Sequence, residues 1–173
     1  FEVSVSQKLS ERGSPVCGIH GADHVEFLLS PNPGEPLKPM KNIASGGEAS
    51  RVMLAVKGAL ADSDAVPCLV FDEVDTGIGG EVAVSVGEHL HELASTKQIL
   101  AITHLASIAV RADNHIKVEK VQGESRTVTQ ARVSEGQDRI REIARMLSGD
   151  STGDASLRHA EELLSRYHSG FRG

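Results

Sequence analysis

The chain has 173 residues, 39% hydrophobic and 24% charged, which is the composition of an ordinary globular domain. Its formal net charge of −6 and its 3% aromatic content argue against a basic or ring-stacking nucleic-acid module. Two isolated cysteines, Cys17 and Cys68, lack metal-binding spacing and favour a reducing compartment. No apolar run approaches the length of a membrane helix, so we expect no membrane partner. Because the chain starts without Met, inside a strand-like run, we expect it to be part of a longer protein.

The first third of the chain predicts two strands, a loop and a helix. Residues 1–5 alternate apolar and polar side chains, and residues 24–30 predict a second strand. Three prolines in residues 31–36 predict a loop, because proline can neither donate a ladder hydrogen bond nor continue a helix. Residues 48–61 have helical spacing. The apolar stripe of this helix comprises Val52, Ala55, Val56, Ala59 and Leu60.

Strands and helices alternate through the middle of the chain. The continuous apolar run 68–71 predicts a strand buried on both faces, as in a parallel sheet. Residues 82–93 carry apolar side chains at helical spacing, and residues 98–103 predict a second buried strand. This alternation indicates an α/β layer with crossover connections.

The last third predicts a hairpin and two helices. Residues 115–121 and 127–133 are expected to pair antiparallel around Gly123. A helix that ends near Gly149 follows, and a last helix runs through residues 157–164. These elements would flank the α/β layer.

A first candidate motif, Ala44-Ser45-Gly46-Gly47-Glu48, stands at the start of the first helix. Two glycines let the backbone approach a ligand closely, and the helix start offers free N–H groups and a positive dipole end to an anion such as a phosphate. The same residues match the S-x-x-E capping box. On this motif alone, both the anion site and a plain helix cap remain open.

A second candidate motif, Asp72-Glu73, follows the apolar run 68–71. Ligands of open α/β sheets bind at the carboxyl ends of the strands, where these acids would lie. The first carboxylate can hold Mg²⁺ and the second can orient an attacking water. The alternative is a strand that runs into an acidic surface loop.

A third candidate is His104, in the segment Ile102-Thr103-His104 at the end of the next predicted strand. A histidine there can hydrogen-bond a γ-phosphate. A lone histidine after a strand more often has a structural role.

In order and spacing the three motifs resemble the signature loop, Walker B strand and switch histidine of ABC ATPases. Val74 stands where transporter ATPases have Pro, which weakens a transporter interpretation. Residues 44–51, 69–83 and 101–120, with 142–149 and the loop 31–36, resemble an SMC-like family of bacterial DNA repair ATPases. That resemblance covers nearly the whole chain. It implies an α/β head lobe with a mainly parallel sheet flanked by helices, plus peripheral antiparallel strands.

The resemblance also implies roles for the acids and the histidine. Asp72 would support Mg²⁺, Glu73 would be the general base for ATP hydrolysis, and His104 would contact the γ-phosphate. Asp75 would lie in the loop that communicates between two sites.

For the signature loop the resemblance implies a contact across a dimer of heads. Ala44 replaces the Leu of many family members, with little expected consequence. The residues expected to reach the γ-phosphate on the other subunit are Ser45, Gly46, Gly47 and Glu48.

The chain contains no G-x-x-x-x-G-K-[ST] loop, the Walker A motif that grips ATP. The resemblance places that loop in an amino-terminal half of a head split by a coiled coil, so residues 1–173 would be the carboxy-terminal part. We therefore expect ATP and Mg²⁺ as cofactors of the completed head and weak or no ATP binding by this chain alone. The implied partners are the amino-terminal half, a second head in a homodimer, and DNA through a full-length, nucleoid-associated cytoplasmic protein.

Two other interpretations remain. The chain could be half of another ABC ATPase head, such as a transporter head, or a non-catalytic interaction module that keeps the fold. The pair Asp72 and Glu73 argues against the latter, since a dead site has no chemical need for both acids.

Overall fold

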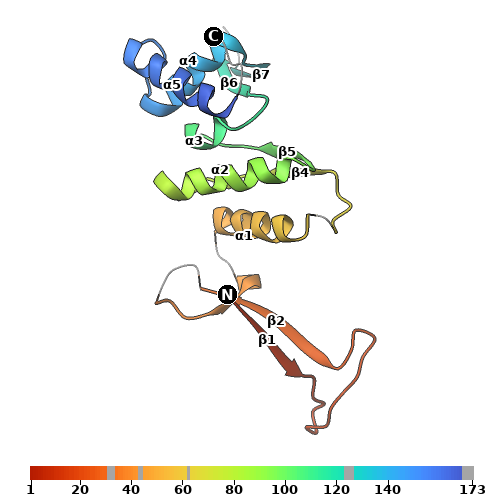
Figure 1. The fold of residues 1–173 in the computed structure, drawn as a ribbon. Helices are drawn as coiled ribbons and strands as arrows, with labels where there is room; N and C mark the ends of the chain where they lie inside the picture. The colour runs from red at the N-terminus through yellow and green to blue at the C-terminus, as the bar shows by residue number, and fades with distance from the viewer. Residues whose placement is uncertain (31–33, 43–44, 62, 123–126, 169–173) are drawn as a thin grey trace. The chain divides into compact units, whose positions relative to one another are not determined.

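The computed structural model describes residues 1–30, 34–42, 45–61, 63–122 and 127–168. The chain divides into two compact units, Phe1–Ala49 and Ser50–Gly173, each considered by itself (Figure 1).

The first unit is a small antiparallel sheet. Strand β1 (Glu2–Gln7) pairs with β2 (Asp23–Leu29), and a short β3 (Lys38–Pro39) joins the other edge of β2. A 3-10 turn, η1 (Met40–Asn42), follows. Both predicted strands are confirmed, whereas β3 was not predicted. Of the predicted loop 31–36, residues 31–33 lie outside the described part of the chain.

Helix α1 (Gly46–Ala59) contains the last residues of the first unit and continues into the second. It begins two residues earlier than predicted, because Ser45 caps it. The predicted apolar stripe does not form the core: Leu54 is the buried residue, whereas Val56 and Leu60 are exposed. The spacing of the apolar residues therefore predicts the helix but not which of its faces packs against other residues.

In the second unit, strand β4 (Cys68–Phe71) pairs in parallel with β5 (Gln98–Ala101) through the crossover helix α2 (Gly80–Ala94). The prediction that residues 68–71 are buried on both faces is wrong for the described residues, since Val70 is 64% exposed, and the predicted burial of the second strand is wrong at Leu100, which is 45% exposed. The described residues cover only one face of the pair. Buried on that side are Leu54, Phe71, Val74, Val86, Leu90, Leu93 and Ile108.

The rest of the second unit is a hairpin and three helices. A short helix α3 (Ala106–Ala109), absent from the prediction, leads to the antiparallel strands β6 (Ile116–Gln122) and β7 (Thr127–Val133). Helices α4 (Gly136–Ser148) and α5 (Asp154–Tyr167) follow as predicted. The buried residues of a second core are Ala106, Ala109, Val110, Ile140, Ile143, Ala144, Ala160 and Leu164.

Helix α4 ends as its sequence predicts. Its C-cap residue Gly149 has a φ of 76°, a left-handed conformation that glycine adopts without a Cβ clash. The expected hairpin is confirmed as well, although Gly123 lies outside the described residues.

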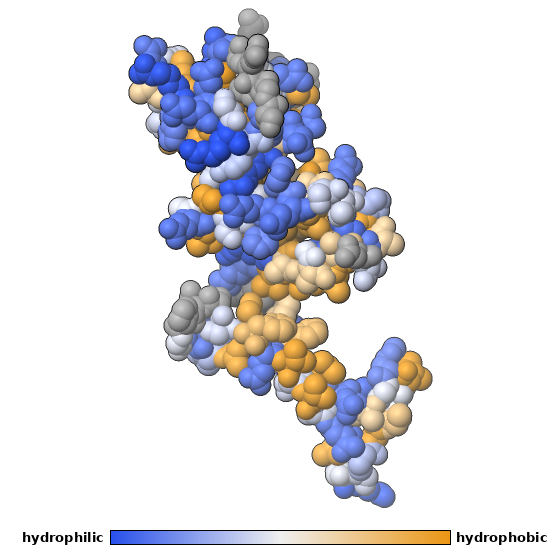
Figure 2. Space-filling view, viewed as in Figure 1, coloured by the Kyte–Doolittle hydropathy of each residue, from blue (hydrophilic) through white to orange (hydrophobic). Residues whose placement is uncertain are grey.

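The α/β class with additional antiparallel strands is confirmed, with β4 and β5 as the parallel pair among the described residues. Both units carry exposed large apolar side chains, and Figure 2 shows apolar surface on each. Among the described helices, none combines the length and the hydropathy needed to cross a membrane.

Candidate functional site

The loop 72–76 leaves the carboxyl end of β4 with two exposed acids, Asp72 and Glu73. The next residue, Val74, is completely buried in the core that contains Phe71 and Leu90. The Ile102 amide donates to the carbonyl oxygen of Phe71 at 2.9 Å, so the chain after β5 runs beside the start of this loop. The acids thus lie where the sequence places them, at the carboxyl edge of the parallel strands.

Glu73 has a left-handed backbone, with a φ of 57°, which no other non-glycine residue of the described chain shares. This conformation costs about 1–2 kcal/mol for a residue with a Cβ. The Thr76 amide closes the turn by donating to the Glu73 carbonyl at 3.0 Å. Strain of this kind persists only where the surroundings over-determine the backbone, and it occurs often at functional sites.

Asp75 anchors the loop from the other side. Its carboxylate is 5% exposed and, through Oδ2, accepts hydrogen bonds from Thr103 Oγ1 at 2.6 Å and from the His104 amide at 2.8 Å. Burial raises the pKa of Asp75, but these hydrogen bonds and the neighbouring imidazole outweigh it and hold the pKa below its ordinary value. Asp75 is therefore an ionised anchor between the loop and the end of β5.

The imidazole of His104 also faces this carboxylate, with Nδ1 2.9 Å from Asp75 Oδ2. The ring is otherwise 74% exposed. With Nδ1 facing Asp75, the Nε2 edge is the one that an outside ligand can reach. Thr103, which sequence reasoning passed over, is part of the same arrangement, and its place directly before His104 at a strand end was the available signal.

Helix α1 holds the same loop by its backbone. Ser50 Oγ donates to the Asp72 carbonyl oxygen at 2.7 Å. Arg51 Nη1 donates to the carbonyl oxygens of Val74 at 3.2 Å and Thr76 at 2.9 Å. Sequence reasoning missed Ser50 and Arg51, because nothing in a helical pattern says which loop a polar side chain will meet.

The glycine-rich motif belongs to the first unit, whereas the two acids belong to the second. Ser45 Oγ accepts the Glu48 amide at 3.0 Å, so Ser45 is the N-cap that the motif predicts. Gly46 and Gly47 are the first residues of α1. Ala44 lies outside the described residues.

The donor set at the loop fits a Mg²⁺ ion that is shared with a phosphate. Within the described ranges, no group of three or more His, Cys, Asp or Glu side chains could hold a metal ion. Mg²⁺ commonly takes one or two protein carboxylates and completes its shell with water and substrate phosphates. The exposed carboxylate of Asp72 suits that arrangement and not an all-protein cage.

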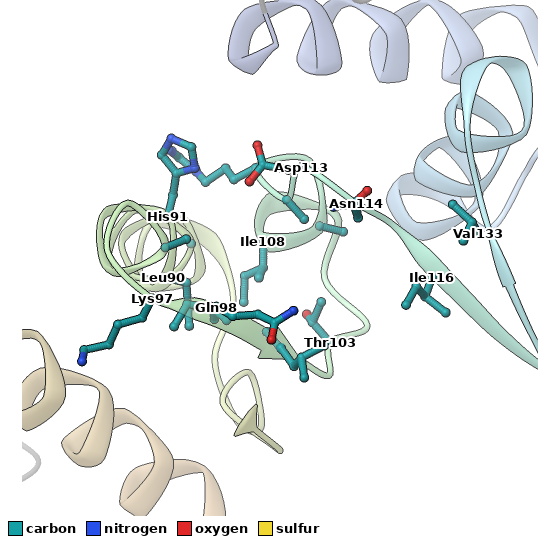
Figure 3. Close-up of a pocket in the computed structure, with 18 residues that line it drawn as sticks. Leu90, His91, Lys97, Gln98, Thr103, Ile108, Asp113, Asn114, Ile116 and Val133 are labelled. Atoms are coloured by element: carbon teal, nitrogen blue, oxygen red, sulfur yellow. The ribbon is translucent and has the colours of Figure 1, made fainter. Parts of the chain in front are cut away.

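A cavity of about 580 Å³ lies beside β5, apart from Asp72 and Glu73 (Figure 3). Residues of α2, β5, α3 and the start of β6 line it, among them Leu90 and Ile108, together with Thr103 from the segment between β5 and α3. Thr103 connects this cavity to the Asp75 anchor, since its hydroxyl donates to that carboxylate.

The α/β fold of the chain is similar to that of solved SMC head domains. A solved Smc head domain with a coiled coil and joint, from Pyrococcus yayanosii, matches 85% of this chain and 25% of that one, with a TM-score of 0.58. At 19% sequence identity this likeness shows the fold.

No protein-family model matches the chain, but it is similar in sequence to several curated proteins. The DNA repair protein RecN of Treponema pallidum is 49% identical over 164 residues, covering 95% of the chain and 29% of RecN. RecN of Deinococcus radiodurans is 54% identical over 147 residues, covering 84% and 25%. RecN of Bacillus subtilis is 44% identical over 171 residues, covering 96% and 30%. The chain therefore corresponds in sequence to a segment of RecN, and it spans less than a third of the length of these relatives.

Proposed function

We propose that residues 1–173 are the carboxy-terminal part of a split ABC-type ATPase head within a RecN-like DNA repair protein. The observation that carries this proposal is the pair Asp72 and Glu73 at the carboxyl end of a parallel strand, tied through Asp75 to His104 at the end of the next strand. The resemblance to RecN over most of the chain supports the same function and disfavours a transporter head.

Each residue of this set has a role in hydrolysis of ATP. Asp72 would hold Mg²⁺, whose charge stabilises the phosphates. Glu73 would orient the attacking water and accept its proton, because its carboxylate is exposed beyond the strand end. His104 would direct its Nε2 edge to the γ-phosphate, while Asp75 fixes the opposite edge of the ring.

The glycine-rich helix start can act both as a cap and as a phosphate contact. Ser45 Oγ accepts the Glu48 amide, which leaves the hydroxyl proton of Ser45 available for donation to an anion. Gly46 and Gly47, at the first turn of α1, add backbone N–H groups and the positive end of the helix dipole. We assign this start to the γ-phosphate bound by a second head in a homodimer.

The amino-terminal half of the head is the partner that would complete the site with its Walker A loop. Among the described residues, the parallel sheet is the single pair β4–β5, and neither strand has a further strand beside its outer edge. An additional strand from elsewhere in the full-length protein would pair with such an edge. With a net charge of −6 this chain offers no generally basic surface, so we assign DNA contact to the full-length protein.

The test is ATP hydrolysis by the full-length protein with and without DNA. Glu73→Gln should abolish turnover and retain bound ATP, because the amide cannot accept the proton of the water. Glu161→Gln, a matched exchange of an exposed glutamate on α5, should hydrolyse ATP as the unchanged protein does. Normal turnover by Glu73→Gln would overturn the assignment, and no hydrolysis by the unchanged protein would favour the non-catalytic module.

A further inference from the structure

The loop that carries Glu73 is held on both sides of that residue by one helix. Ser50 Oγ binds the carbonyl oxygen of Asp72, directly before Glu73, at 2.7 Å. Arg51 Nη1 binds the carbonyl oxygens of Val74 at 3.2 Å and Thr76 at 2.9 Å, directly after it. All three acceptors are main-chain atoms, so the grip acts on the backbone and leaves the Glu73 side chain unoccupied.

We infer that Ser50 and Arg51 are positioning residues that form a clamp around Glu73, setting the direction of its carboxylate and through it the rate of ATP hydrolysis. The inference rests on the proposed function, because it presumes that Glu73 activates water. It adds residues outside the glycine-rich motif and the Asp-Glu pair to the working parts of the site.

The backbone of Glu73 explains why a clamp is needed. A φ of 57° is unfavourable for glutamate, so a free loop would leave this conformation and the carboxylate would change direction. Val74, in the core, and Asp75, hydrogen-bonded to the segment that follows β5, fix the chain after Glu73. Among the described residues, Ser50 alone binds the carbonyl oxygen before Glu73, and Arg51 binds two carbonyl oxygens of the turn that follows.

The chemistry of Arg51 suits this role better than that of a surface charge. Its side chain is half-buried, and in the described ranges no carboxylate lies within ion-pair distance of it. One terminal guanidinium nitrogen carries two hydrogens, which is what two neighbouring carbonyl acceptors require. A lysine ammonium at this position keeps the charge but lacks the planar fork.

The test is steady-state ATPase kinetics and equilibrium ATP binding by the full-length protein. Arg51→Ala should lower kcat about tenfold to 100-fold, because a displaced general base loses the near-attack geometry. The KM and the Kd for ATP should stay within about twofold, since the clamp does not hold nucleotide. Arg51→Lys should recover part of kcat. Arg141→Ala, a matched change of an exposed arginine on α4, should leave both constants unchanged.

A gentler variant keeps the inference testable if Arg51→Ala does not fold. Ser50→Ala removes a single hydrogen bond, to the Asp72 carbonyl, and should lower kcat about threefold to tenfold with unchanged ATP binding. Unchanged kcat in both Ser50→Ala and Arg51→Lys, with hydrolysis still abolished by Glu73→Gln, overturns the clamp and leaves the proposed function standing. Normal hydrolysis by Glu73→Gln instead overturns the proposed function itself.

Discussion

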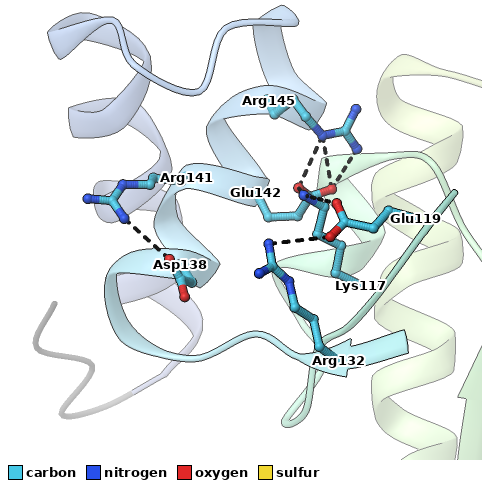
Figure 4. Close-up of polar contacts among 7 residues, drawn as sticks. All are labelled: Lys117, Glu119, Arg132, Asp138, Arg141, Glu142 and Arg145. Carbon is cyan, nitrogen blue, oxygen red and sulfur yellow. Dashed lines mark hydrogen bonds and ion pairs between the residues drawn. The ribbon is translucent and has the colours of Figure 1, made fainter. Parts of the chain in front are cut away.

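Glu142 is the charged centre of the contact between helix α4 and the β6–β7 hairpin (Figure 4). Its carboxylate accepts from Arg145 Nε at 3.0 Å and Nη2 at 2.5 Å, and it pairs with Lys117 Nζ at 3.3 Å. Lys117 also pairs with Glu119 at 2.9 Å on the same strand. The glutamate therefore joins two elements that are far apart in the sequence.

The pH dependence of this contact follows from the pKa of Glu142. Burial raises that pKa, but Arg145 and Lys117 outweigh the burial and hold it below the ordinary value. An acid with a lowered pKa stabilises the fold fully above its unfolded pKa of about 4.3, and this stabilisation is lost as the pH falls through the folded value. The contact is therefore intact at neutral pH.

The perturbation is Glu142→Gln, which keeps the shape and removes the charge. The Glu142 side chain is 7% exposed, so the substitution leaves Lys117 charged with no carboxylate at that buried position. Breaking a fully buried pair costs about 3–5 kcal/mol, but Arg145 is half exposed and can return to water. We expect a loss of about 2 kcal/mol, in the range for hydrogen bonds to charged groups.

Asp138→Asn is the matched control on the same helix. Asp138 pairs with Arg141 at 3.2 Å, and its side chain is 65% exposed. An exposed pair of this spacing contributes about 0.5 kcal/mol or less. Both substitutions replace a carboxylate on α4 by an amide, so the main difference between the two variants is the burial of the replaced side chain.

The measurement is amide hydrogen exchange in the full-length protein, followed in peptides from β6, β7 and α4. A loss of about 2 kcal/mol lowers protection about 30-fold, since 1.4 kcal/mol is a factor of ten. The control should lower it about twofold. Equal protection in the two variants would refute the reasoning that burial decides the value of an ion pair here.

His115 and the glycines Gly87 and Gly58, all in the second unit, allow two further tests. Burial lowers the pKa of His115, and the charge of Arg139 lowers it further. Below a pH of about 6.5 the unfolded chain therefore binds a proton more readily than the folded chain, so the fold loses stability as the pH falls. The exchange protection of β6 should decrease over the same pH range, and His115→Gln should make that decrease smaller. Gly87→Ala would place a Cβ 3.0 Å from Arg111 Cδ and should destabilise the fold by about 1–3 kcal/mol. At Gly58 an added Cβ meets open space, so Gly58→Ala should stabilise the fold by about 0.5 kcal/mol. Thermal unfolding measures both changes. An unchanged pH slope, or equal effects of the two alanines, would contradict these predictions.

Local signals in the sequence found most elements because each element is specified by its neighbours along the chain. The strand before Asp72 and the helix that ends at Gly149 follow from an apolar run and a terminal glycine. The helix α3 was missed, since a helix of four residues has no period to detect. The burial predicted for the parallel strands failed at Val70 and Leu100, because coverage of a face depends on other residues of the fold.

The order of the motifs was likewise readable along the chain. Ser45 caps α1 as its spacing to Glu48 predicts, and Asp72 and Glu73 follow β4 as the apolar run predicts. These features depend on residues no more than a few positions apart, so they can be predicted from local sequence.

The way in which the loop 72–76 is held depends on contacts between segments that are distant in the sequence. The contacts from Ser50 and Arg51 join residues 22 to 25 positions apart, and the contact from Thr103 to Asp75 joins residues 28 apart. The left-handed backbone of Glu73 depends on those contacts, since no local preference of glutamate favours it. Hydrogen bonds between distant segments form only when the chain folds. The sequence alone therefore indicates Asp72 and Glu73 as candidate residues, whereas the backbone conformation of Glu73 depends on the folded structure.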